Sequence, residues 1–417
     1  MNQPTVAVVG AGVSGLTAAH LMRDSHRVTL FEADQRLGGH AHTHDVPASD
    51  GSTLRVDSGF IVMNDRTYPH LMRLFAELGV ETRPTEMSMG ISCEECGLAY
   101  VGGRGAGGIF AQRRRLLDPT FWRLLAQVPR FHRRARALLA GDEDPTWGEF
   151  LAAGGFSEHF VRHFAMPLVS VVWSCGDQDA AHYPARHLFA FLDHHGMLSV
   201  KGSPTWRTVV GGSRSYVDRL AAGLDDVRTR ARVLGVTRHA DGVDVVTAEG
   251  RTTYDRVVLA VHADQALAVL EDATPEEKEA LGAITYSRNE TLLHHDPTLL
   301  PADPRARGSW NHRMDSCAGG AEQVVVSYWM NRLQGLGDTR DHVVTLNATD
   351  RVDPDLVEAA MVYEHPVFTP EAVRAAAVLR GGGGPRLAFA GAHLGWGFHE
   401  DGCRSAVEAV ASFGVTW

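Results

Sequence analysis

The amino-terminal residues place two short apolar runs on either side of a predicted helix. Residues 5–9 (TVAVV) form a continuous apolar run, which is typical of a buried strand in a parallel sheet. Residues 16–23 follow as a predicted helix, and residues 27–32 (RVTLFE) form a second predicted strand. This order of strand, helix and strand predicts a βαβ unit, and therefore an α/β domain at the start of the chain.

Two later parts of the chain repeat this alternation. The first has a predicted strand at 230–233, a hairpin that turns at Asp241-Gly242, and a buried strand at 254–261. The second is a predicted strand at 386–391, followed by a helix at 403–413. Because strands from distant segments can join one parallel sheet, we expect all three parts to build the same domain.

The glycines between the first strand and the first helix predict a phosphate-binding turn. Gly10, Gly12 and Gly15 have the GxGxxG spacing of dinucleotide-binding βαβ units. Gly10 permits the tight turn, Gly12 lets the backbone approach a pyrophosphate, and Gly15 lets the helix pack closely on the strand. Glu32 ends the second strand, where a carboxylate can bind a ribose diol and would repel a 2′-phosphate, so NADP is disfavoured.

The residues after Glu32 distinguish FAD from NAD. Glu32-Ala-Asp-Gln-Arg-Leu-Gly38-Gly39-His40 and Val56-Asp57-Ser-Gly59-Phe60-Ile61 resemble segments of the flavin amine oxidase-like enzymes. In that family the Gly-Gly loop runs beside the FAD pyrophosphate, and the second segment reaches the flavin ring. An arginine usually follows the Gly-Gly pair, whereas this chain has His40. The resemblance implies non-covalent FAD and an oxidoreductase.

The motif and the resemblance together give a set of expected FAD contacts. The family's adenine contact corresponds to Val233, and its contacts to the pyrimidine end of the flavin come from the start of the last helix. An acid that often follows the strand glycine is replaced here by Ala392. The expected cofactor-binding residues are Gly10, Gly12, Val13, Ser14, Gly15, Glu32, Ala33, Gly38, Gly39, His40, Gly59, Phe60, Ile61, Val233, Ala260, Gly391, Asp401, Gly402 and Cys403.

The fold class follows from these assignments. We expect an α/β FAD-binding domain, Rossmann-like and of glutathione-reductase type, with an inserted mixed α+β substrate domain. The FAD-binding domain takes residues 1–61, 206–265 and 385–417. The substrate-binding domain takes residues 62–205 and 266–384.

Charge and cysteine content narrow the classes of function. The chain has 417 residues and a formal net charge of −10, which disfavours nucleic-acid binding. Five cysteines are few and odd in number, which indicates a reducing compartment. Cys93-Glu-Glu-Cys96 is an isolated CxxC, which we interpret as a loop or hairpin with two free thiols; a metal or redox role is the alternative. We therefore assign no metal ligands.

Three alternating histidines follow the Gly-Gly pair. On a strand, His40, His42 and His44 would share one face, which would suit a metal ion. We favour polar residues near the cofactor entrance, with His40 closest to the phosphates.

The chain as a whole resembles a narrower bacterial group, described only as predicted NAD/FAD-binding oxidoreductases. Matching segments include Arg66-Thr-Tyr-Pro69, Trp206-Arg-Thr-Val-Val-Gly-Gly-Ser213, Tyr363-Glu-His-Pro366 and Gly397-Phe-His-Glu-Asp-Gly402. Members are often encoded beside, or fused to, cyclopropane fatty-acid synthases. The resemblance implies an apolar lipid substrate and a synthase-like partner.

Four functions are consistent with this resemblance. The first is an FAD-dependent desaturase or dehydrogenase of an acyl chain, and the second is a flavin-dependent double-bond isomerase. The third is a non-catalytic flavin-bearing partner of a fatty-acid-modifying enzyme, and the fourth, which we favour least, is an amine oxidase. Our candidate catalytic residues are His262, which follows a buried strand, Tyr328 and His399.

A basic segment indicates where the protein could meet a membrane. Residues 104–139 carry nine arginines and a single acid, Asp118, with apolar residues at helical spacing and an adjacent Trp122. Such a helix suits an anionic membrane surface. The alternative is a surface helix with its apolar face in the core and its arginines in water. With no signal peptide and no apolar stretch of about 18 residues, we expect a cytoplasmic protein, with peripheral contact at the inner membrane face as an option.

Overall fold

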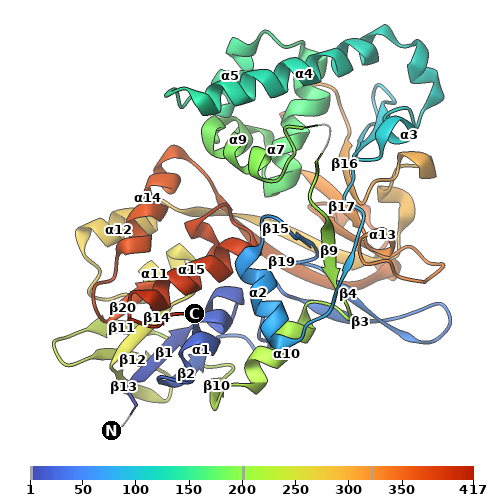
Figure 1. The fold of residues 1–417 in the computed structure, drawn as a ribbon. Helices are drawn as coiled ribbons and strands as arrows, with labels where there is room; N and C mark the ends of the chain where they lie inside the picture. Colours follow the sequence, from blue (N-terminus) through green and yellow to red (C-terminus); the bar gives the residue numbers. More distant parts are fainter. Residues whose placement is uncertain (1–2, 200–201, 321–322) are drawn as a thin grey trace.

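The computed structural model describes residues 3–199, 202–320 and 323–417 (Figure 1). A five-stranded parallel sheet has the order β10-β2-β1-β14-β20. Its central strand is almost fully buried, as the apolar run predicts. The strands are β1 (Thr5–Val9), β2 (Arg27–Phe31), β10 (Asp226–Arg228), β14 (Arg256–Leu259) and β20 (Leu387–Phe389).

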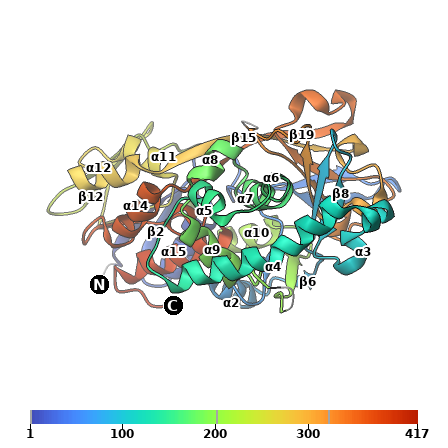
Figure 2. The same ribbon diagram turned by 90° about the horizontal axis from the view of Figure 1, so that it is seen from above.

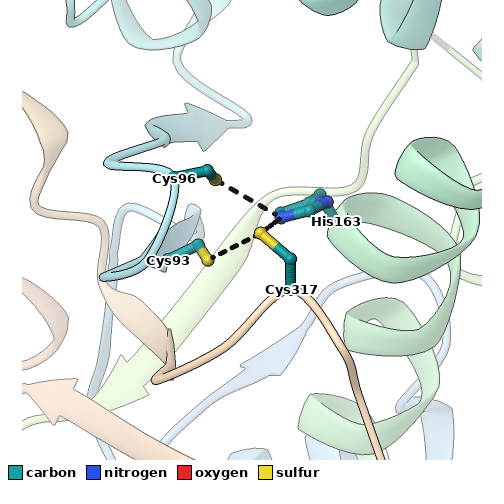
Figure 3. A group of neighbouring side chains, drawn as sticks. All are labelled: Cys93, Cys96, His163 and Cys317. Atoms are coloured by element: carbon teal, nitrogen blue, oxygen red, sulfur yellow. Dashed lines mark hydrogen bonds between the residues drawn. The ribbon is translucent and has the colours of Figure 1, made fainter.

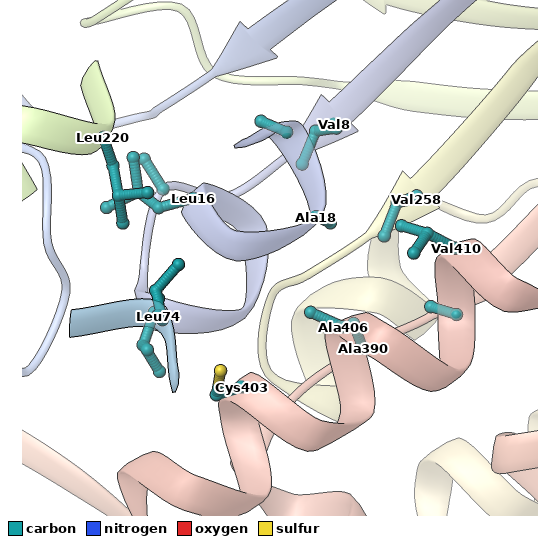
Figure 4. Close-up of a cluster of buried hydrophobic side chains, with 14 of the residues drawn as sticks. Val8, Leu16, Ala18, Leu74, Leu220, Val258, Ala390, Cys403, Ala406 and Val410 are labelled. Carbon is teal, nitrogen blue, oxygen red and sulfur yellow. The ribbon is translucent and has the colours of Figure 1, made fainter. Parts of the chain in front are cut away.

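Helices cover one face of this sheet, and their apolar side chains form a single core (Figure 4). In it, Leu16 of the first helix and Val410 of the last pack against Val8 and Val258 of the strands. The helices are α1 (Val13–Met22), α2 (Pro69–Leu78), α10 (Arg214–Ala222) and α15 (His399–Ala411).

The other face of the sheet packs against three helices and a small antiparallel sheet. The helices are α11 (Ala263–Val269), α12 (Pro275–Gly282) and α14 (Pro370–Gly381). The strands are β11 (Gly235–Arg238), β12 (Val243–Thr247) and β13 (Gly250–Tyr254). Segments that we expected in the substrate domain, α2, α12 and α14, thus contribute to the cores around the nucleotide-binding sheet.

A seven-stranded mixed sheet forms the second layer, in the order β19-β15-β18-β17-β16-β7-β8. Only β7 and β16 pair in parallel; the other neighbours are antiparallel. The strands are β7 (Met89–Cys93), β8 (Ala99–Gly102), β15 (Thr285–His294), β16 (Trp310–Met314), β17 (Val325–Trp329), β18 (Val343–Leu346) and β19 (Val357–Val367).

A helical subdomain lies beyond this sheet (Figures 1 and 2). Its core is aromatic, because Phe131, Trp147 and Phe189 are fully buried and pack edge to face. The helices are α4 (Pro119–Ala140), α5 (Trp147–Gly154), α6 (Glu158–Phe160), the π-helical turn Val161–Ala165, α7 (Met166–Trp173), α8 (Asp177–His182) and α9 (Ala185–His194).

Short elements connect these layers. Strands β3 (Thr43–Pro47) and β4 (Thr53–Asp57) form one ribbon, and β5 (Met63–Asn64), β9 (Trp206–Val209) and β6 (Thr82–Pro84) form a small sheet. Two short helices, α3 (Gly105–Ile109) and α13 (Met330–Leu333), accompany the second layer. The 3-10 turns are Arg113–Leu117, Pro297–Leu299, Pro304–Ala306, Thr349–Arg351, Pro354–Leu356 and Ala392–Leu394.

Two local predictions were wrong. No strand forms at 230–233, because Arg230 adopts a left-handed φ of 54°; the edge strand is β10, a few residues earlier. The last helix begins at His399 rather than at Cys403, because Asp401 accepts a hydrogen bond from the Phe398 N–H and stabilises an earlier start. The hairpin that turns at Asp241-Gly242 is confirmed as β11 and β12.

The basic segment forms α3, the 3-10 turn Arg113–Leu117 and most of α4. Phe121, Leu124, Phe131, Ala135 and Leu138 are buried in the protein core, so the apolar face is not free. Among the described residues, no helix is long and apolar enough to cross a membrane.

Candidate functional site

The turn between β1 and α1 has the geometry of a phosphate-binding loop. Gly10 has a φ of 97°, and its N–H donates to Phe31 O at 2.8 Å. A Cβ on Gly15 would lie 1.8 Å from Gly10 O, whereas a Cβ on Gly12 would meet nothing within 4 Å. The outer two glycines are therefore needed for packing, and Gly12 leaves the backbone open at the positive end of α1.

Glu32 and the Gly-Gly loop border this turn. The Glu32 carboxylate accepts hydrogen bonds from the N–H groups of Ala11 and Asp34, both at 2.9 Å. Gly38 N–H donates to Ala11 O, and the Gly39 backbone passes close to Gly12. The loop is fixed by a residue absent from our expected contacts: the Arg36 guanidinium donates to the carbonyls of Leu37, Gly39 and Ala41 at 2.7–3.1 Å.

Two further glycines allow distant segments to close over the turn. A Cβ on Gly59 would lie 2.2 Å from His40 O, and Phe60 N–H donates to that same oxygen. A Cβ on Gly402 would lie 2.7 Å from Val13 and 2.9 Å from the Ser14 hydroxyl. The structure thus brings the Gly59 segment against the Gly-Gly loop and the Gly402 segment against the start of α1.

Two acidic residues in the first turn of α15, Glu400 and Asp401, form the contacts that stabilise this end of the helix. Asp401 caps the helix and pairs with Arg404 at 3.0 Å, and burial raises the pKa of this carboxyl. Glu400 accepts hydrogen bonds from the His70 and Leu71 N–H groups and so caps α2. The Cys403 thiol is buried in the core (Figure 4), so any contact of this residue with a cofactor must come from its backbone.

The remaining expected contacts lie on elements of the same domain. Val233 is buried in the same core as Phe31, and Ala231, two residues before it, donates its N–H to Glu32 O. Ala260 N–H donates to Val9 O at the end of β1. Gly391 N–H donates to the Ser405 hydroxyl at 2.9 Å. Ile61 instead packs in a core with strands of the second sheet, so its side chain contributes to that core. Ala33 is exposed next to Glu32.

These residues fit FAD. The open cradle at Gly12, a carboxylate at the ribose position, and the buried, unpartnered His40 Nε2 provide groups for the pyrophosphate, the ribose and a polar ligand atom. A second helix, α15, directs its N-terminus at the same region, where its dipole would stabilise negative charge on a flavin ring.

A group of histidines gathers beside this region. The rings of His40 and His365 lie 5.5 Å apart, and both interact electrostatically with His262. Burial lowers the pKa of His393 and His399 to about 3 and that of His365 to about 4. These imidazoles are therefore uncharged at neutral pH, although each still has one donor and one acceptor nitrogen.

The three candidate catalytic residues differ in their surroundings. His262 stacks on Tyr286 at 4.2 Å, and its Nδ1 lies 3.4 Å from a Glu364 carboxylate oxygen; burial lowers its pKa. His399 stacks on Phe60 at 3.8 Å, and its Nε2 lies 3.0 Å from the Tyr216 hydroxyl.

Tyr328 lies on β17 and packs edge to face on Trp310. Burial raises the pKa of its hydroxyl to about 12, which makes proton release difficult. Of the three, His262 has the best surroundings for a base, because a carboxylate can orient it.

The histidines at 40, 42 and 44 do not act as one set. The rings of His42 and His44 lie 4.0 Å apart and are tilted by 37°, while His40 turns toward Tyr363 and His365. Only His44 lies within β3, so the shared strand face that we considered does not form.

Asp57 is a buried carboxylate beside the cofactor region. It belongs to the segment 56–61 but was not among our expected site residues. Asp57 accepts hydrogen bonds from Thr43 at 2.6 Å, from the Ser213 N–H and hydroxyl, and from Gln334 at 2.9 Å. Desolvation still outweighs these donors and raises its pKa to about 6. Asp57 thus connects the end of β4 to two distant segments, at Ser213 and Gln334.

A cavity of about 380 Å³ lies next to the loop that leads into α15. Apolar residues from four elements line it, including Tyr68, Val373, Trp396 and Phe398. Two polar atoms on its wall, Trp396 Nε1 and His187 Nε2, are buried and have no hydrogen-bond partner within the part of the chain that the structure describes.

The fold and the site define a class: a flavoprotein in which a βαβ unit and two later segments form one nucleotide-binding domain. Residues 13–290 match the family of flavin containing amine oxidoreductases. The chain belongs to this family of FAD-dependent oxidoreductases, and FAD is its cofactor.

Individual relatives are distant. A protein of Mycobacterium tuberculosis described as the flavin-containing monoamine oxidase AofH is 29% identical over 277 residues, which are 61% of this chain but only 56% of that protein's length. The cyclohexylamine oxidase from Brevibacterium oxydans has a TM-score of 0.72 at 15% identity, covering 99% of this chain and 98% of that one. A CLA-producing fatty acid isomerase from P. acnes has a TM-score of 0.68 at 19% identity, covering 98% of both chains. These structural similarities establish the fold.

Proposed function

We propose that the protein removes hydrogen from an apolar acyl chain, as an FAD-dependent desaturase or dehydrogenase. The observation that carries this proposal is the cavity beside the cofactor region, whose exposed wall is mainly aromatic and aliphatic, with charged groups at Arg380, Glu400, Asp401 and Arg404. A fatty acid isomerase with the same fold supports the choice of substrate class.

The polar groups of the cavity suit the head group of such a substrate. Arg380 lines the cavity and forms no ion pair with an acid among the described residues; its Nε–H donates to Ala376 O. Trp396 Nε1–H is a buried donor without an acceptor. An acyl carboxylate or ester accepts such hydrogen bonds, while its chain fills the apolar part.

The histidines would then perform the proton chemistry. FAD, when bound, accepts a hydride equivalent from a substrate carbon. His262 accepts the proton from the adjacent carbon at an imidazole nitrogen, which is available because burial keeps the ring uncharged. Glu364 orients this ring and stabilises the imidazolium that forms. The two hydrogens leave as a hydride and a proton, and a carbon–carbon double bond forms.

The test is an anaerobic incubation of the holoprotein with phospholipids and with free fatty acids. Bleaching of the flavin absorbance without reoxidation, together with a new double bond, supports desaturation. A shifted double bond with oxidised flavin would instead identify an isomerase. Bleaching by amines alone would identify an amine oxidase, and no change with any compound would leave the non-catalytic partner role.

A matched pair of variants tests the cavity. Arg380→Gln should raise KM for a fatty acid, because the carboxylate loses its charged donor. Arg374→Gln is the control, since Arg374 lies on the same helix, is exposed, and pairs with Glu371. Equal KM values for the two variants would contradict the assigned head-group site.

We also propose peripheral contact with an anionic membrane through the turn before α4. Leu117 is 90% exposed, and Leu116 and Trp122 are 48% exposed, beside Arg113 and Arg114. Replacing Leu116 and Leu117 by Ser should abolish sedimentation with phosphatidylglycerol vesicles, whereas Leu234→Ser, at another exposed leucine, should not. Binding that is equal for neutral and anionic vesicles would contradict this proposal. The synthase-like partner stays a prediction.

A further inference from the structure

Three cysteines and a histidine that are distant in the sequence meet at one point (Figure 3). They are Cys93, Cys96, His163 and Cys317, and their ligand atoms all lie within 4.8 Å of one another. We propose that these four side chains bind one Zn²⁺ ion as a structural Cys3His site. The CxxC pair, which looked isolated in the sequence, is thus completed by two residues from other segments.

The distances between the side-chain atoms fit a single tetrahedral ion. Cys93 Sγ and Cys317 Sγ lie 3.5 Å apart, and His163 Nε2 lies 3.5 Å from Cys317 Sγ and 3.6 Å from Cys96 Sγ. Tetrahedral zinc, with bonds of about 2.3 Å to sulfur and about 2.0 Å to nitrogen, separates its ligand atoms by roughly 3.5–3.8 Å. Only a small movement of the side chains is needed to centre an ion.

The histidine is already in the tautomer that a metal requires. His163 Nδ1 lies 3.1 Å from His159 O, and because a carbonyl oxygen only accepts, Nδ1 carries the hydrogen. The lone pair is therefore on Nε2, which faces the thiols. The ring nitrogen that does not bind the metal typically donates to a carbonyl or carboxylate, which fixes the ligand orientation.

The backbone around the cluster places the ligands. Cys93 ends β7, and the hairpin turn to β8 presents Cys96, with Gly97 in the left-handed region at a φ of 62°. His163 lies in the π-helical turn between α6 and α7, a local irregularity that is frequent at functional sites. The Tyr100 hydroxyl donates to His163 O at 2.7 Å and joins the turn to β8.

The two glutamates of the CxxC segment bind residues around the loop that carries Cys317. Glu95 accepts hydrogen bonds from the Ser316 hydroxyl at 2.7 Å and the Cys317 N–H at 2.8 Å. Glu94 pairs with Arg313 of β16. These contacts hold the loop after β16 where the Cys317 thiol reaches the cluster.

Arginines of the basic segment surround the turn. Arg114 donates to Gly97 O at 2.8 Å, and Arg115 donates to Cys96 O at 3.1 Å. Three thiolates and one Zn²⁺ leave a net charge of −1, which these guanidinium groups offset. Two arginines of the segment for which the sequence suggested membrane contact, Arg114 and Arg115, thus bind the cysteine-containing turn instead.

The four ligands leave no open coordination position, which is the arrangement of structural rather than catalytic zinc. They come from the edge of the seven-stranded sheet, from the loop after β16, and from the helical subdomain. A metal ion here would fix the helical subdomain to the sheet.

The experiment measures metal in the full-length, FAD-containing protein purified under reducing conditions. We expect one zinc per chain, by elemental analysis and by native mass spectrometry. Exchange for Co²⁺ should give the thiolate charge-transfer and visible bands of tetrahedral cobalt. His163→Gln and Cys96→Ser should lose most of the zinc, and Glu95→Ala, a positioning variant, should weaken binding about 10- to 100-fold. His159→Gln, next to the cluster but not a ligand, should retain the metal.

Several results would overturn the proposal. A wild-type chain without metal that is lighter by two hydrogens, and whose peptide map links Cys93 to Cys317, would show a disulfide instead. Iron in place of zinc would refute the assigned ion, and zinc retained by both ligand variants would refute the site. If a ligand variant fails to fold, the metal content and the cobalt spectrum of the wild-type protein still decide.

Discussion

The nucleotide-binding turn and the Cys3His cluster are built in opposite ways. The turn uses backbone groups and the absence of side chains, and its glycines, at positions 10, 12 and 15, belong to one βαβ unit. The cluster uses side-chain ligands from three segments, and its most distant members are separated by more than half the chain. We infer that the first site depends on local packing, whereas the second depends on how separate layers meet.

The largest expected effect distinguishes two glycines of the turn. Gly15→Ala should prevent folding, at a cost of more than about 4 kcal/mol, because its Cβ would lie 1.8 Å from Gly10 O. Gly12→Ala should fold normally, since its Cβ meets nothing within 4 Å, but should bind FAD about 100-fold more weakly, or about 2.7 kcal/mol. Thermal unfolding of the apoproteins and FAD titration measure the two effects. Equal stability of both variants would contradict the packing role of Gly15.

Metal removal should loosen the region around the Cys3His cluster and leave the nucleotide-binding turn unchanged. Chelation should speed hydrogen exchange in the helical subdomain and at the β7–β8 turn, while FAD stays bound. The free energy of local unfolding should fall by several kcal/mol, which is a fraction of the roughly 10–16 kcal/mol that zinc binding supplies in small zinc-folded domains. Hydrogen exchange with mass spectrometry locates the change, and release of FAD with the metal would show that the two regions are coupled.

The raised pKa of Asp57, near the nucleotide-binding region, predicts that the free energy of unfolding depends on pH. Its pKa is about 6 in the folded protein and 3.8 in the unfolded chain, so the folded state holds the extra proton between these values. Its contribution to the free energy of unfolding should fall by about 3 kcal/mol as the pH rises from about 4 to 7. The stability difference between wild type and Asp57→Asn should change by that amount. Parallel pH curves for the two proteins would contradict the prediction.

The smallest effect concerns the contact between the last helix and α2. Glu400→Gln removes the charge and one of the acceptors that cap α2, which should cost about 1 kcal/mol. Glu408→Gln, on an exposed face of the same helix, should change the stability little. Denaturant unfolding compares the two, and an equal loss would show that the capping contact contributes nothing specific.

The sequence by itself determined the nucleotide-binding region. Gly10, Gly12, Gly15 and Glu32 act through backbone conformation and through the βαβ unit that contains them, so their spacing alone indicates their function. The first strand was predicted with its observed bounds for the same reason.

Tertiary structure decided what the sequence could not. Cys317 and His163 carry no local pattern, and they join Cys93 and Cys96 only because the loop after β16 and the π-helical turn pack against one hairpin. The apolar face of α4 likewise looked available for a membrane until the aromatic core of the helical subdomain covered it. Side-chain sites between layers depend on packing over long sequence separations, and a sequence records such packing only indirectly.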